Sequence, residues 1–222
     1  VAVQMNDGQR RDVDHVVLAV PWRRFAELVA DVPQLSDWPA IQLSRQLESS
    51  PITGVHLWFD RPIMELPHAV LVGTLSQWVF RRAADSPTSG HYYQVVISAS
   101  RQLADSDRDE VVRQIVDELQ QVFPESRGAT LLRSRVVTEH HAVFSPQPGI
   151  ESRRPTARTP LVNLALAGDW IATGWPATME GAVRSGYRAA EVILNALGQP
   201  QSCAVDELPE ALLTRCLTRG AK

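Results

Sequence analysis

The stretch that decides the fold is LVNLALAGDW at positions 161–170, followed after two residues by TGWPATMEGAV at positions 173–183. An apolar strand runs into Gly168 and Asp169, a loop with glycine and proline follows, and helical spacing begins near Met179. In an open α/β sheet, ligands bind at the carboxyl ends of strands, where a helix N-terminus offers unpaired N–H groups and partial positive charge. The stretch therefore predicts a site for an anionic or carbonyl-rich ligand.

The helix expected at 179–197 carries small side chains that favour close packing on a sheet. The face predicted to pack consists of Ala182, Val183, Gly186, Ala189, Ala190 and Ile193. Tyr187 and Arg188 stand where a Walker motif needs Lys and Ser or Thr, and no two of the 12 glycines stand two residues apart, as G-x-G-x-x-G requires. Neither of these phosphate-binding fingerprints occurs in the chain.

The remaining segments predict a mixed α/β protein. An Asn-Asp-Gly turn at 6–8 predicts a hairpin whose second arm is the apolar run 15–20, buried on both faces, and a helix begins at Pro21. Charge and apolar spacing at 107–123 predict an amphipathic helix that covers a mixed or antiparallel sheet. Strands of that sheet are expected at 52–59, 69–72, 77–81 and 92–99, an irregular loop at 145–160, and a short helix at 207–217.

Composition excludes several classes of protein. The chain has 222 residues, 22 basic against 25 acidic, without the clustered positive charge that nucleic acid requires. Its uncharged stretches are far shorter than the roughly 20 apolar residues that cross a bilayer. Cys203 and Cys216 are its two cysteines and predict no disulfide framework, so a reducing, cytoplasmic compartment is expected.

Several short motifs resemble a known family. AGD at 167–169, TGWP at 173–176 and MEGA at 179–182 look like the C-terminal flavin-binding signature of the amine oxidase and phytoene desaturase superfamily. GWPATMEGAVRSGY at 174–187, with LWFDR at 57–61, most resembles the squalene-associated FAD-dependent desaturases, also called hydroxysqualene dehydroxylases. The resemblance extends over about residues 1–197.

This resemblance implies an α/β (mixed α+β) fold: the C-terminal part of a two-domain, Rossmann-like FAD-binding flavoprotein whose mixed-sheet substrate domain is covered by helices. The N-terminal ADP-binding half with its G-x-G-x-x-G is missing, so we expect a C-terminal fragment that is inactive alone and has little affinity for FAD. The implied domains are 1–40 (part of the FAD-binding domain), 41–140 (substrate-binding domain), 141–198 (C-terminal FAD-binding segment) and 199–222 (tail).

The resemblance also implies the cofactor contacts. Asp169 would accept hydrogen bonds from the ribitol or lie next to the pyrophosphate, and the Met179 N–H would point at the N1/C2=O2 edge of the flavin. Trp175 and Pro176 would form a wall near the isoalloxazine ring. The full predicted set is Gly168, Asp169, Trp170, Gly174, Trp175, Pro176, Met179, Glu180 and Gly181, with no catalytic residue assigned and no metal ligand.

Each of these residues also has a structural interpretation. Asp169 could cap the turn after the strand, and Glu180 could be a surface residue that complements the helix dipole. Met179 could fill the core through its side chain while acting through its backbone. Arg153 and Arg154 are expected in a solvated loop, with phosphate anchoring or closure over the flavin as the alternative.

Aromatic and histidine side chains raise two further alternatives. Trp58, Trp78 and Phe80 are either ordinary core residues, which the residue types favour, or contacts for an isoprenoid chain that offers almost no polar group. His140 and His141 are adjacent on a strand, where side chains point to opposite faces, so together they do not predict a metal site.

The function implied is FAD-dependent conversion of hydroxysqualene to squalene for hopanoid synthesis, with a lipophilic isoprenoid substrate. The alternatives are another flavoenzyme of the superfamily (phytoene desaturase, protoporphyrinogen oxidase or amine oxidase) or a non-catalytic lipid-binding remnant. An insoluble substrate favours peripheral docking of a cytoplasmic enzyme at the inner membrane face.

Overall fold

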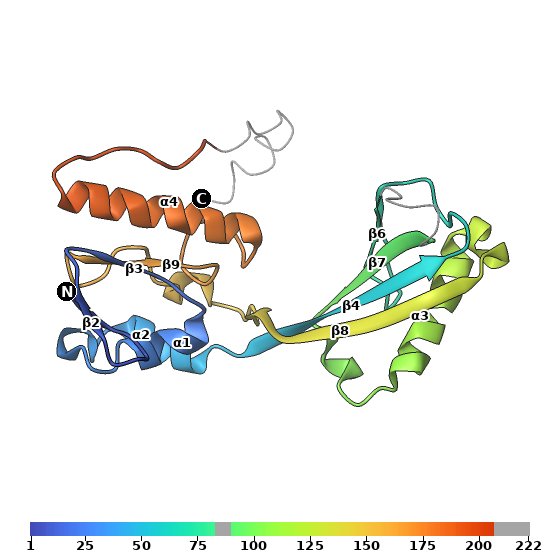
Figure 1. Cartoon of the computed structure of the whole chain (residues 1–222), viewed down its shortest axis with the longest axis horizontal. Helices are drawn as coiled ribbons and strands as arrows, with labels where there is room; N and C mark the ends of the chain where they lie inside the picture. The colour runs from blue at the N-terminus through green and yellow to red at the C-terminus, as the bar shows by residue number, and fades with distance from the viewer. Residues whose placement is uncertain (83–89, 207–222) are drawn as a thin grey trace. The chain divides into compact units, whose positions relative to one another are not determined.

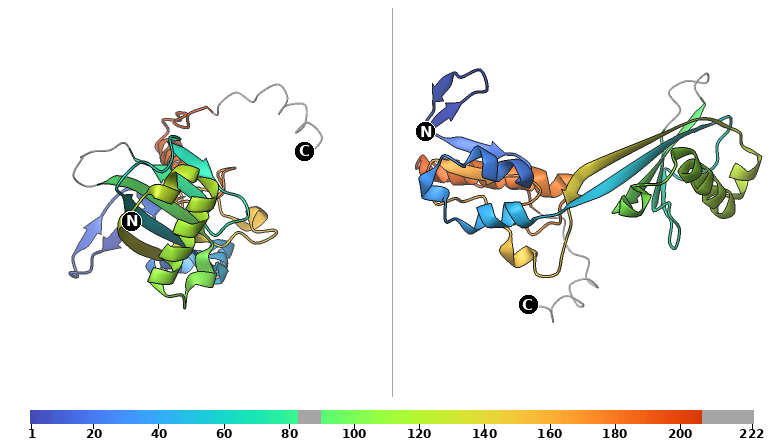
Figure 2. Two further views of the ribbon diagram at one scale, coloured as in Figure 1. Left: turned by 90° about the vertical axis from the view of Figure 1, so that its right-hand side faces the viewer. Right: turned by 90° about the horizontal axis from the view of Figure 1, so that it is seen from below.

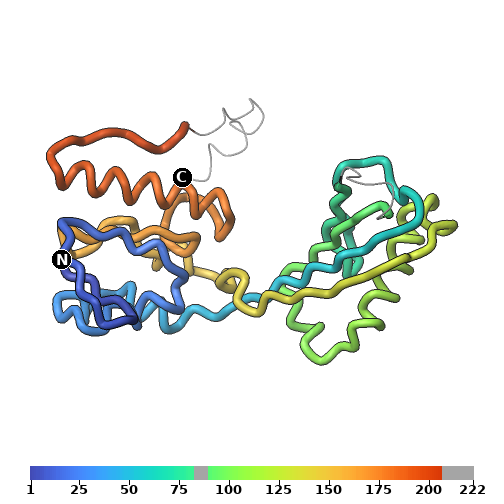
Figure 3. The backbone as a smooth tube through the Cα atoms, viewed as in Figure 1, coloured from blue at the N-terminus to red at the C-terminus, as the bar shows by residue number. Residues whose placement is uncertain are grey.

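The computed structural model describes residues 1–82 and 90–206, so the helix expected at 207–217 and Cys216 lie outside the described residues. The chain divides into two compact units. Unit 1 combines Val1–Leu47 with Gln147–Lys222, and unit 2 is Glu48–Pro146. The backbone trace in Figure 3 shows that the chain leaves unit 1 once and returns to it once.

The unit boundaries lie later in the chain than the predicted domain boundaries. The expected boundary after residue 40 falls inside helix α2 (Pro39–Gln46), which buries Ala40, Ile41 and Leu43 in unit 1. The expected boundary after residue 140 falls inside strand β8 (Leu131–Phe144), whose pairing with its neighbour continues to Phe144. A helix or strand with continuous packing belongs to one unit along its whole length.

Unit 1 has a two-stranded parallel sheet between helices. Strand β3 (Val16–Ala19) pairs with β9 (Leu164–Ala167), in which every residue is buried. In Figure 1, helix α4 (Met179–Ala196) lies on one side of this sheet, and α1 (Trp22–Leu28) and α2 lie on the other. The predicted strand before Gly168 and the predicted helices after Pro21 and at Met179 are confirmed.

The prediction for the opening hairpin was wrong in its second arm. Strand β1 (Ala2–Gln4) pairs antiparallel with the polar strand β2 (Arg10–Asp12), and this hairpin stands apart from the sheet in Figure 2. The apolar run instead forms β3, because pairing with the apolar β9 buries more apolar surface than a hairpin does. Burial on both faces was also wrong, since Val17 is 45% exposed and burial alternates along β3.

Unit 2 is a five-stranded antiparallel sheet with a helix on one face. The strand order is β5 (His68–Val70), β6 (Trp78–Arg81), β7 (His91–Ser98), β4 (Ser49–Phe59), β8. Helix α3 (Arg108–Val122) covers one face, as Figure 2 shows, and packs Ile115 and Leu119 on the core of the unit. The Asp107 carboxylate caps α3 by accepting hydrogen bonds from the Asp109 and Glu110 N–H groups.

The amphipathic helix and the four predicted strands are confirmed, and their sheet is antiparallel. The fourteen-residue β8 extends the sheet at the edge beyond β4. Short 3-10 turns occur at Pro33–Leu35, Ser100–Leu103, Pro124–Gly128 and Glu151–Arg153.

Candidate functional site

Strand β9 ends at a glycine that no other residue can replace without strain. Gly168 has φ of 140°, and a Cβ atom there would lie 2.8 Å from Cδ1 of Trp170. Its N–H donates to Oγ of Ser185 in α4 at 2.7 Å. The glycine thus allows the strand end, the following loop and α4 to pack closely at one point.

Trp170 is part of the core of unit 1. Its ring is fully buried, lies 5.2 Å between centroids from Phe25, and donates from Nε1 to the Val20 carbonyl at 3.0 Å. The side chain therefore has no surface left for a ligand. Of the predicted cofactor contacts, Trp170 can contribute through its backbone alone, because its side chain anchors the loop.

Asp169 presents a half-buried carboxylate beside this glycine. Burial raises the pKa of the Asp169 carboxyl, while its own backbone N–H and the charge of Arg154 act in the opposite direction. Within residues 1–82 and 90–206, no other group donates a hydrogen bond to the carboxylate. Since a buried carboxylate is costly without donors, this position is suited to accepting hydrogen bonds from a ligand.

Arg154 holds the loop that follows, and the prediction of a solvated side chain was wrong for it. Its guanidinium is fully buried and donates to four backbone carbonyls, from 2.5 Å at Ile171 to 3.3 Å at Trp170. The other two are those of Asp169 and Trp175, both at 2.8 Å, and Glu151 pairs with Nη1. No sequence pattern predicted this role, because the acceptors are backbone carbonyls, which residue type does not mark.

A second arginine, on α4, also donates to backbone carbonyls of this loop. Arg188 donates to the carbonyls of Thr173 at 2.9 Å and Ala172 at 3.4 Å. Together Arg154 and Arg188 turn the carbonyl oxygens of 169–173 and 175 toward the two guanidinium groups. The loop between β9 and α4 is thereby fixed before any ligand binds.

The start of α4 is exposed, and the side chain of Thr178 caps one of its free N–H groups. Thr178 Oγ1 accepts from the Gly181 N–H at 3.1 Å, and the side chain of Met179 is 89% exposed, so the core-filling interpretation of that side chain was wrong. In the part of the chain that the structure describes, no group accepts from the N–H of Met179 or Glu180. A Cβ atom at Gly181 would lie 2.7 Å from the Pro176 carbonyl, so glycine lets the loop approach the helix. These first-turn N–H groups remain available to an acceptor.

The other predicted residues of the loop lie on its surface. Gly174 and Pro176 are exposed, and Gly174 has φ of 83°. Trp175 is half-buried under the guanidinium of Arg184, 5.2 Å from the ring centroid. Glu180 is exposed in the first turn of α4, as the interpretation as a surface residue expected, and accepts from Nε of the same Arg184 at 2.7 Å.

The face of α4 that packs matches the predicted one only in part, since Ala189 belongs to both. Gly181, Ser185 and Ala189 are buried, whereas Gly186 and Val183 are exposed. Successive helical residues point about 100° apart, and small residues occur on two neighbouring faces of this helix. Residue type therefore did not distinguish the packed face from its neighbour. The hydrogen bond from the Gly168 N–H to Ser185 identifies the packed face.

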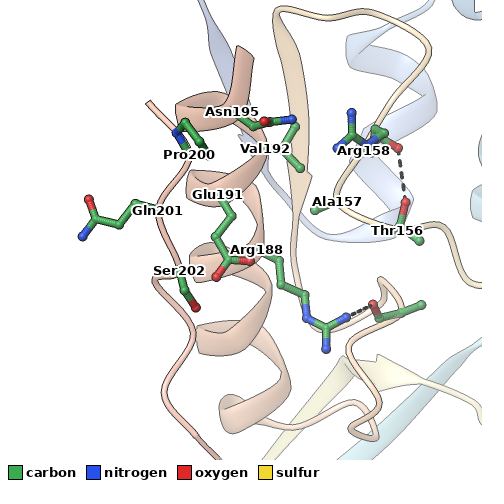
Figure 4. A pocket seen from close by; sticks show the side chains of 11 residues that line it. Thr156, Ala157, Arg158, Arg188, Glu191, Val192, Asn195, Pro200, Gln201 and Ser202 are labelled. Carbon is green, nitrogen blue, oxygen red and sulfur yellow. Dashed lines mark hydrogen bonds between the residues drawn. The ribbon is translucent and has the colours of Figure 1, made fainter. Parts of the chain in front are cut away.

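A pocket of about 680 Å³ lies elsewhere in unit 1, along the C-terminal half of α4. Figure 4 shows Arg188, Glu191 and Asn195 on one wall, with Thr156 and Arg158 opposite. None of the predicted cofactor contacts lines it. The pocket is therefore distinct from the start of α4.

The sheet of unit 2 leaves one face uncovered by α3, which we call the open face. On it Trp78 and Phe80 stack at 5.6 Å between centroids and are 39% and 40% exposed, and Trp58 lies against Tyr92 at 5.1 Å. The core interpretation of these aromatic residues was wrong, because they alternate with the buried side chains. The open face carries His68, Val70, Trp78, Phe80, Tyr92, Gln94, Val96, Gly54, His56, Trp58, Arg133, Arg135 and Val137.

Two further features concern metals and membranes. His141 donates or accepts at Nδ1 with Ser49 Oγ at 2.8 Å, and within the described ranges no three His, Cys, Asp or Glu side chains gather as a metal site would require. No helix in residues 1–82 and 90–206 has the length and apolar character to span a bilayer.

Comparison with known proteins gives a consistent picture. Residues 1–194 match the family described as flavin containing amine oxidoreductase. Hydroxysqualene dehydroxylase of Sinorhizobium fredii is 35% identical over 82% of this chain and 39% of its own length. The 15-cis-phytoene desaturase of Solanum lycopersicum is 28% identical over 86% of this chain and 34% of its own.

Solved structures show the same fold. Cyclohexylamine oxidase from Brevibacterium oxydans superposes with a TM-score of 0.64 over 86% of this chain and 44% of that one, at 16% identity. A putrescine oxidase variant gives 0.62 over 87% and 46%. The chain thus spans less than half the length of these relatives.

Proposed function

This chain belongs to the flavin-containing amine oxidoreductase family, and from that premise we propose that it is part of a FAD-dependent oxidoreductase that converts hydroxysqualene to squalene. The observation that carries the proposal is 32–35% identity to hydroxysqualene dehydroxylases of three bacteria over 82% of the chain. The chain covers 39% of the length of each of these relatives, so the activity of the whole protein is part of the proposal.

The residues between β9 and α4 fit a flavin on their own geometry. A Cβ at Gly168 or Gly181 would collide with Trp170 or with the Pro176 carbonyl, so these glycines let the loop pack closely beside the start of α4. The first N–H groups of α4 are exposed, and the Asp169 carboxylate lacks an outside donor among the described residues. Acceptors at the helix start and hydroxyl donors beside Asp169 are what a flavin with its ribitol would provide.

The chemistry that reduced FAD supplies when bound is a hydride. The exposed amides of Met179 and Glu180 at the start of α4 would stabilise negative charge at the pyrimidine edge by about 0.3 to 2 kcal/mol. Asp169 would accept hydrogen bonds from the ribitol, and Trp175 with Pro176 would shield the ring from water. Arg154 and Arg188 would keep these groups positioned by holding the loop carbonyls.

The open face of unit 2 is the surface we assign to the isoprenoid chain. Such a chain offers methyl and methylene groups over its whole length, so binding must come from apolar contact area. Trp58, Trp78 and Phe80 supply that area with flat rings, and aromatic faces also stabilise positive charge in a nearby substrate.

Phytoene desaturation is the second candidate, favoured by 28% identity to the tomato enzyme over 86% of the chain. The test uses the protein expressed from the complete reading frame that contains this chain, loaded with FAD. Hydroxysqualene, phytoene and a polyamine are each incubated anaerobically with the oxidised or reduced enzyme, and products are identified by mass spectrometry. Squalene formation supports the proposal, and turnover of the polyamine alone refutes it.

A protein that holds no flavin and converts none of the three compounds would instead support a non-catalytic lipid-binding role. A lipophilic substrate also favours reversible docking of a cytoplasmic enzyme on a membrane surface. Flotation with liposomes tests this, and failure of the flavin-loaded protein to float with any liposome would refute it.

A further inference from the structure

Two polar side chains meet among the aromatic rings of the open face. His56 on β4 lies directly opposite Gln94 on β7, and the neighbouring pair is Trp58 opposite Tyr92. Both pairs face away from α3, because Leu57 and Tyr93 between them are fully buried on the other side. The strand register therefore places an imidazole and an amide side by side among aromatic rings.

Gly54 leaves a gap next to these two groups. A Cβ atom at Gly54 would lie 3.5 Å from Nε2 of Gln94 and 3.7 Å from Nε2 of His56. The two nitrogens thus border the same space beside Gly54, and no side chain of residue 54 fills it. We call His56, Gln94 and the gap at Gly54 the polar niche.

Tyr92 fixes the orientation of the imidazole. Its hydroxyl lies 2.6 Å from Nδ1 of His56, and the two rings stack at 5.9 Å between centroids. Within residues 1–82 and 90–206, Nε2 of His56 and the Gln94 amide have no hydrogen-bond partner. Nε2 is therefore free to bind a ligand.

The imidazole of His56 is uncharged in this setting. Burial, followed by the positive charge of Arg135 on β8, lowers the pKa of His56, so the ring is uncharged at neutral pH. In the tautomer that accepts the Tyr92 hydroxyl hydrogen at Nδ1, the neutral ring donates at Nε2, and in the other tautomer Nε2 accepts from a hydroxyl. The Gln94 amide offers donors beside the same space.

We propose that the polar niche binds the single hydroxyl group of a linear isoprenoid alcohol whose chain lies on the aromatic open face. The proposal rests on the function proposed above and adds the residues that recognise the one polar group of the substrate. A hydroxyl beside Gly54 would accept from the Gln94 amide and donate to or accept from Nε2 of His56, whereas a hydrocarbon would cover both groups and leave them unsatisfied. The niche therefore favours an alcohol over the matching hydrocarbon by about tenfold or more.

The test measures binding of farnesol and of farnesene, its hydrocarbon counterpart, to the intact chain by quenching of tryptophan fluorescence. His56→Phe removes the imidazole nitrogens and keeps a ring. Gly54→Ala puts a methyl group at the gap at ordinary contact distances, so the strand should tolerate it. Trp78→Ala, which lies away from the niche on β6, is the matched control for lost apolar area.

We expect the unaltered chain to bind farnesol at least tenfold more tightly than farnesene. His56→Phe and Gly54→Ala should each remove that preference and leave farnesene binding within about twofold. Trp78→Ala should weaken both ligands alike. Equal binding of the two ligands by the unaltered chain, or a preference retained in His56→Phe, overturns the proposal.

The two proposals fail in different ways. If the alcohol preference is present and depends on His56 but the complete enzyme does not form squalene, the proposed function fails and the niche stands as an alcohol site. If squalene forms at the same rate and KM with His56→Phe, the niche fails and the proposed function stands.

Discussion

Replacement of Arg154 by methionine removes the group that holds the loop between β9 and α4. Methionine matches the length of the arginine stem but has no donors. Four backbone carbonyls and one side of an ion pair lose their partner. The carbonyls of Trp170 and Ile171 belong to fully buried residues that water does not reach.

The magnitude follows from these buried acceptors. Each buried carbonyl left without a donor costs about 1 to 3 kcal/mol, so the two together cost about 2 to 6 kcal/mol. The side chain of Glu151 is 65% exposed and can be solvated, so it adds little. We expect Arg154→Met to lower the stability of unit 1 by about 3 to 5 kcal/mol, a large part of the total of a typical domain.

The matched control is Arg153→Met, one residue earlier. Arg153 is exposed and bonds to the side chain of Gln46, so its loss should change stability by less than about 0.5 kcal/mol. Hydrogen exchange measured by mass spectrometry reports the two units separately. In Arg154→Met, exchange in peptides of 164–190 should accelerate a hundredfold or more, while peptides of β4 and β7 remain unchanged.

Equal protection of residues 164–190 in the two variants would refute the reasoning. Arg154→Lys refines the test, because lysine keeps the charge but cannot reach the same set of carbonyls with one planar group. It should fall between the unaltered chain and Arg154→Met. Full protection in the lysine variant would mean that charge alone, and not the geometry of the guanidinium, holds the loop.

Three other changes probe the same region. Gly168→Ala should destabilise unit 1, because φ at Gly168 is 140° and the new Cβ would meet the Trp170 ring. Gly186→Ala adds a methyl group in open space on α4 and should stabilise unit 1 by about 0.5 to 1 kcal/mol. Denaturant midpoints that move in the same direction for both variants would contradict this prediction. Burial raises the pKa of Asp169, so the folded state loses stability as pH rises through that pKa. Asp169→Asn should therefore have a higher melting temperature than the unaltered chain at pH 7, and this difference should disappear below the pKa of the unfolded chain, near pH 4. A lower melting temperature of Asp169→Asn at pH 7 would refute this prediction. Thr178→Ala removes the cap of α4 and should cost about 1 kcal/mol in denaturant titrations, which Thr178→Ser should restore; an unchanged midpoint in the alanine variant would show that the cap adds nothing.

Local patterns were sufficient for most elements. The apolar run into Gly168, the helix start at Met179 and the amphipathic helix α3 depend on neighbours in sequence, and all three were predicted from residue spacing. Contacts between distant segments were not predictable in this way. The hairpin arm was misassigned because an apolar run does not indicate which strand it pairs with, and β3 pairs with a strand almost 150 residues later.

The sequence by itself indicated the family through its motifs and predicted the strand before Gly168, the helices after Pro21, at 107–123 and at Met179, and four strands of unit 2, because these follow from short-range patterns. It also marked the stretch 167–183 as the candidate cofactor site. Strand β2, helix α2 and the full length of β8 were not predicted. Only the tertiary structure decided that Arg154 is buried among loop carbonyls, that Trp170 belongs to the core, and that His56 and Gln94 meet beside Gly54. The physical reason is that burial and hydrogen-bond partners are set by strand register and packing between segments far apart in the chain, which residue type alone does not encode.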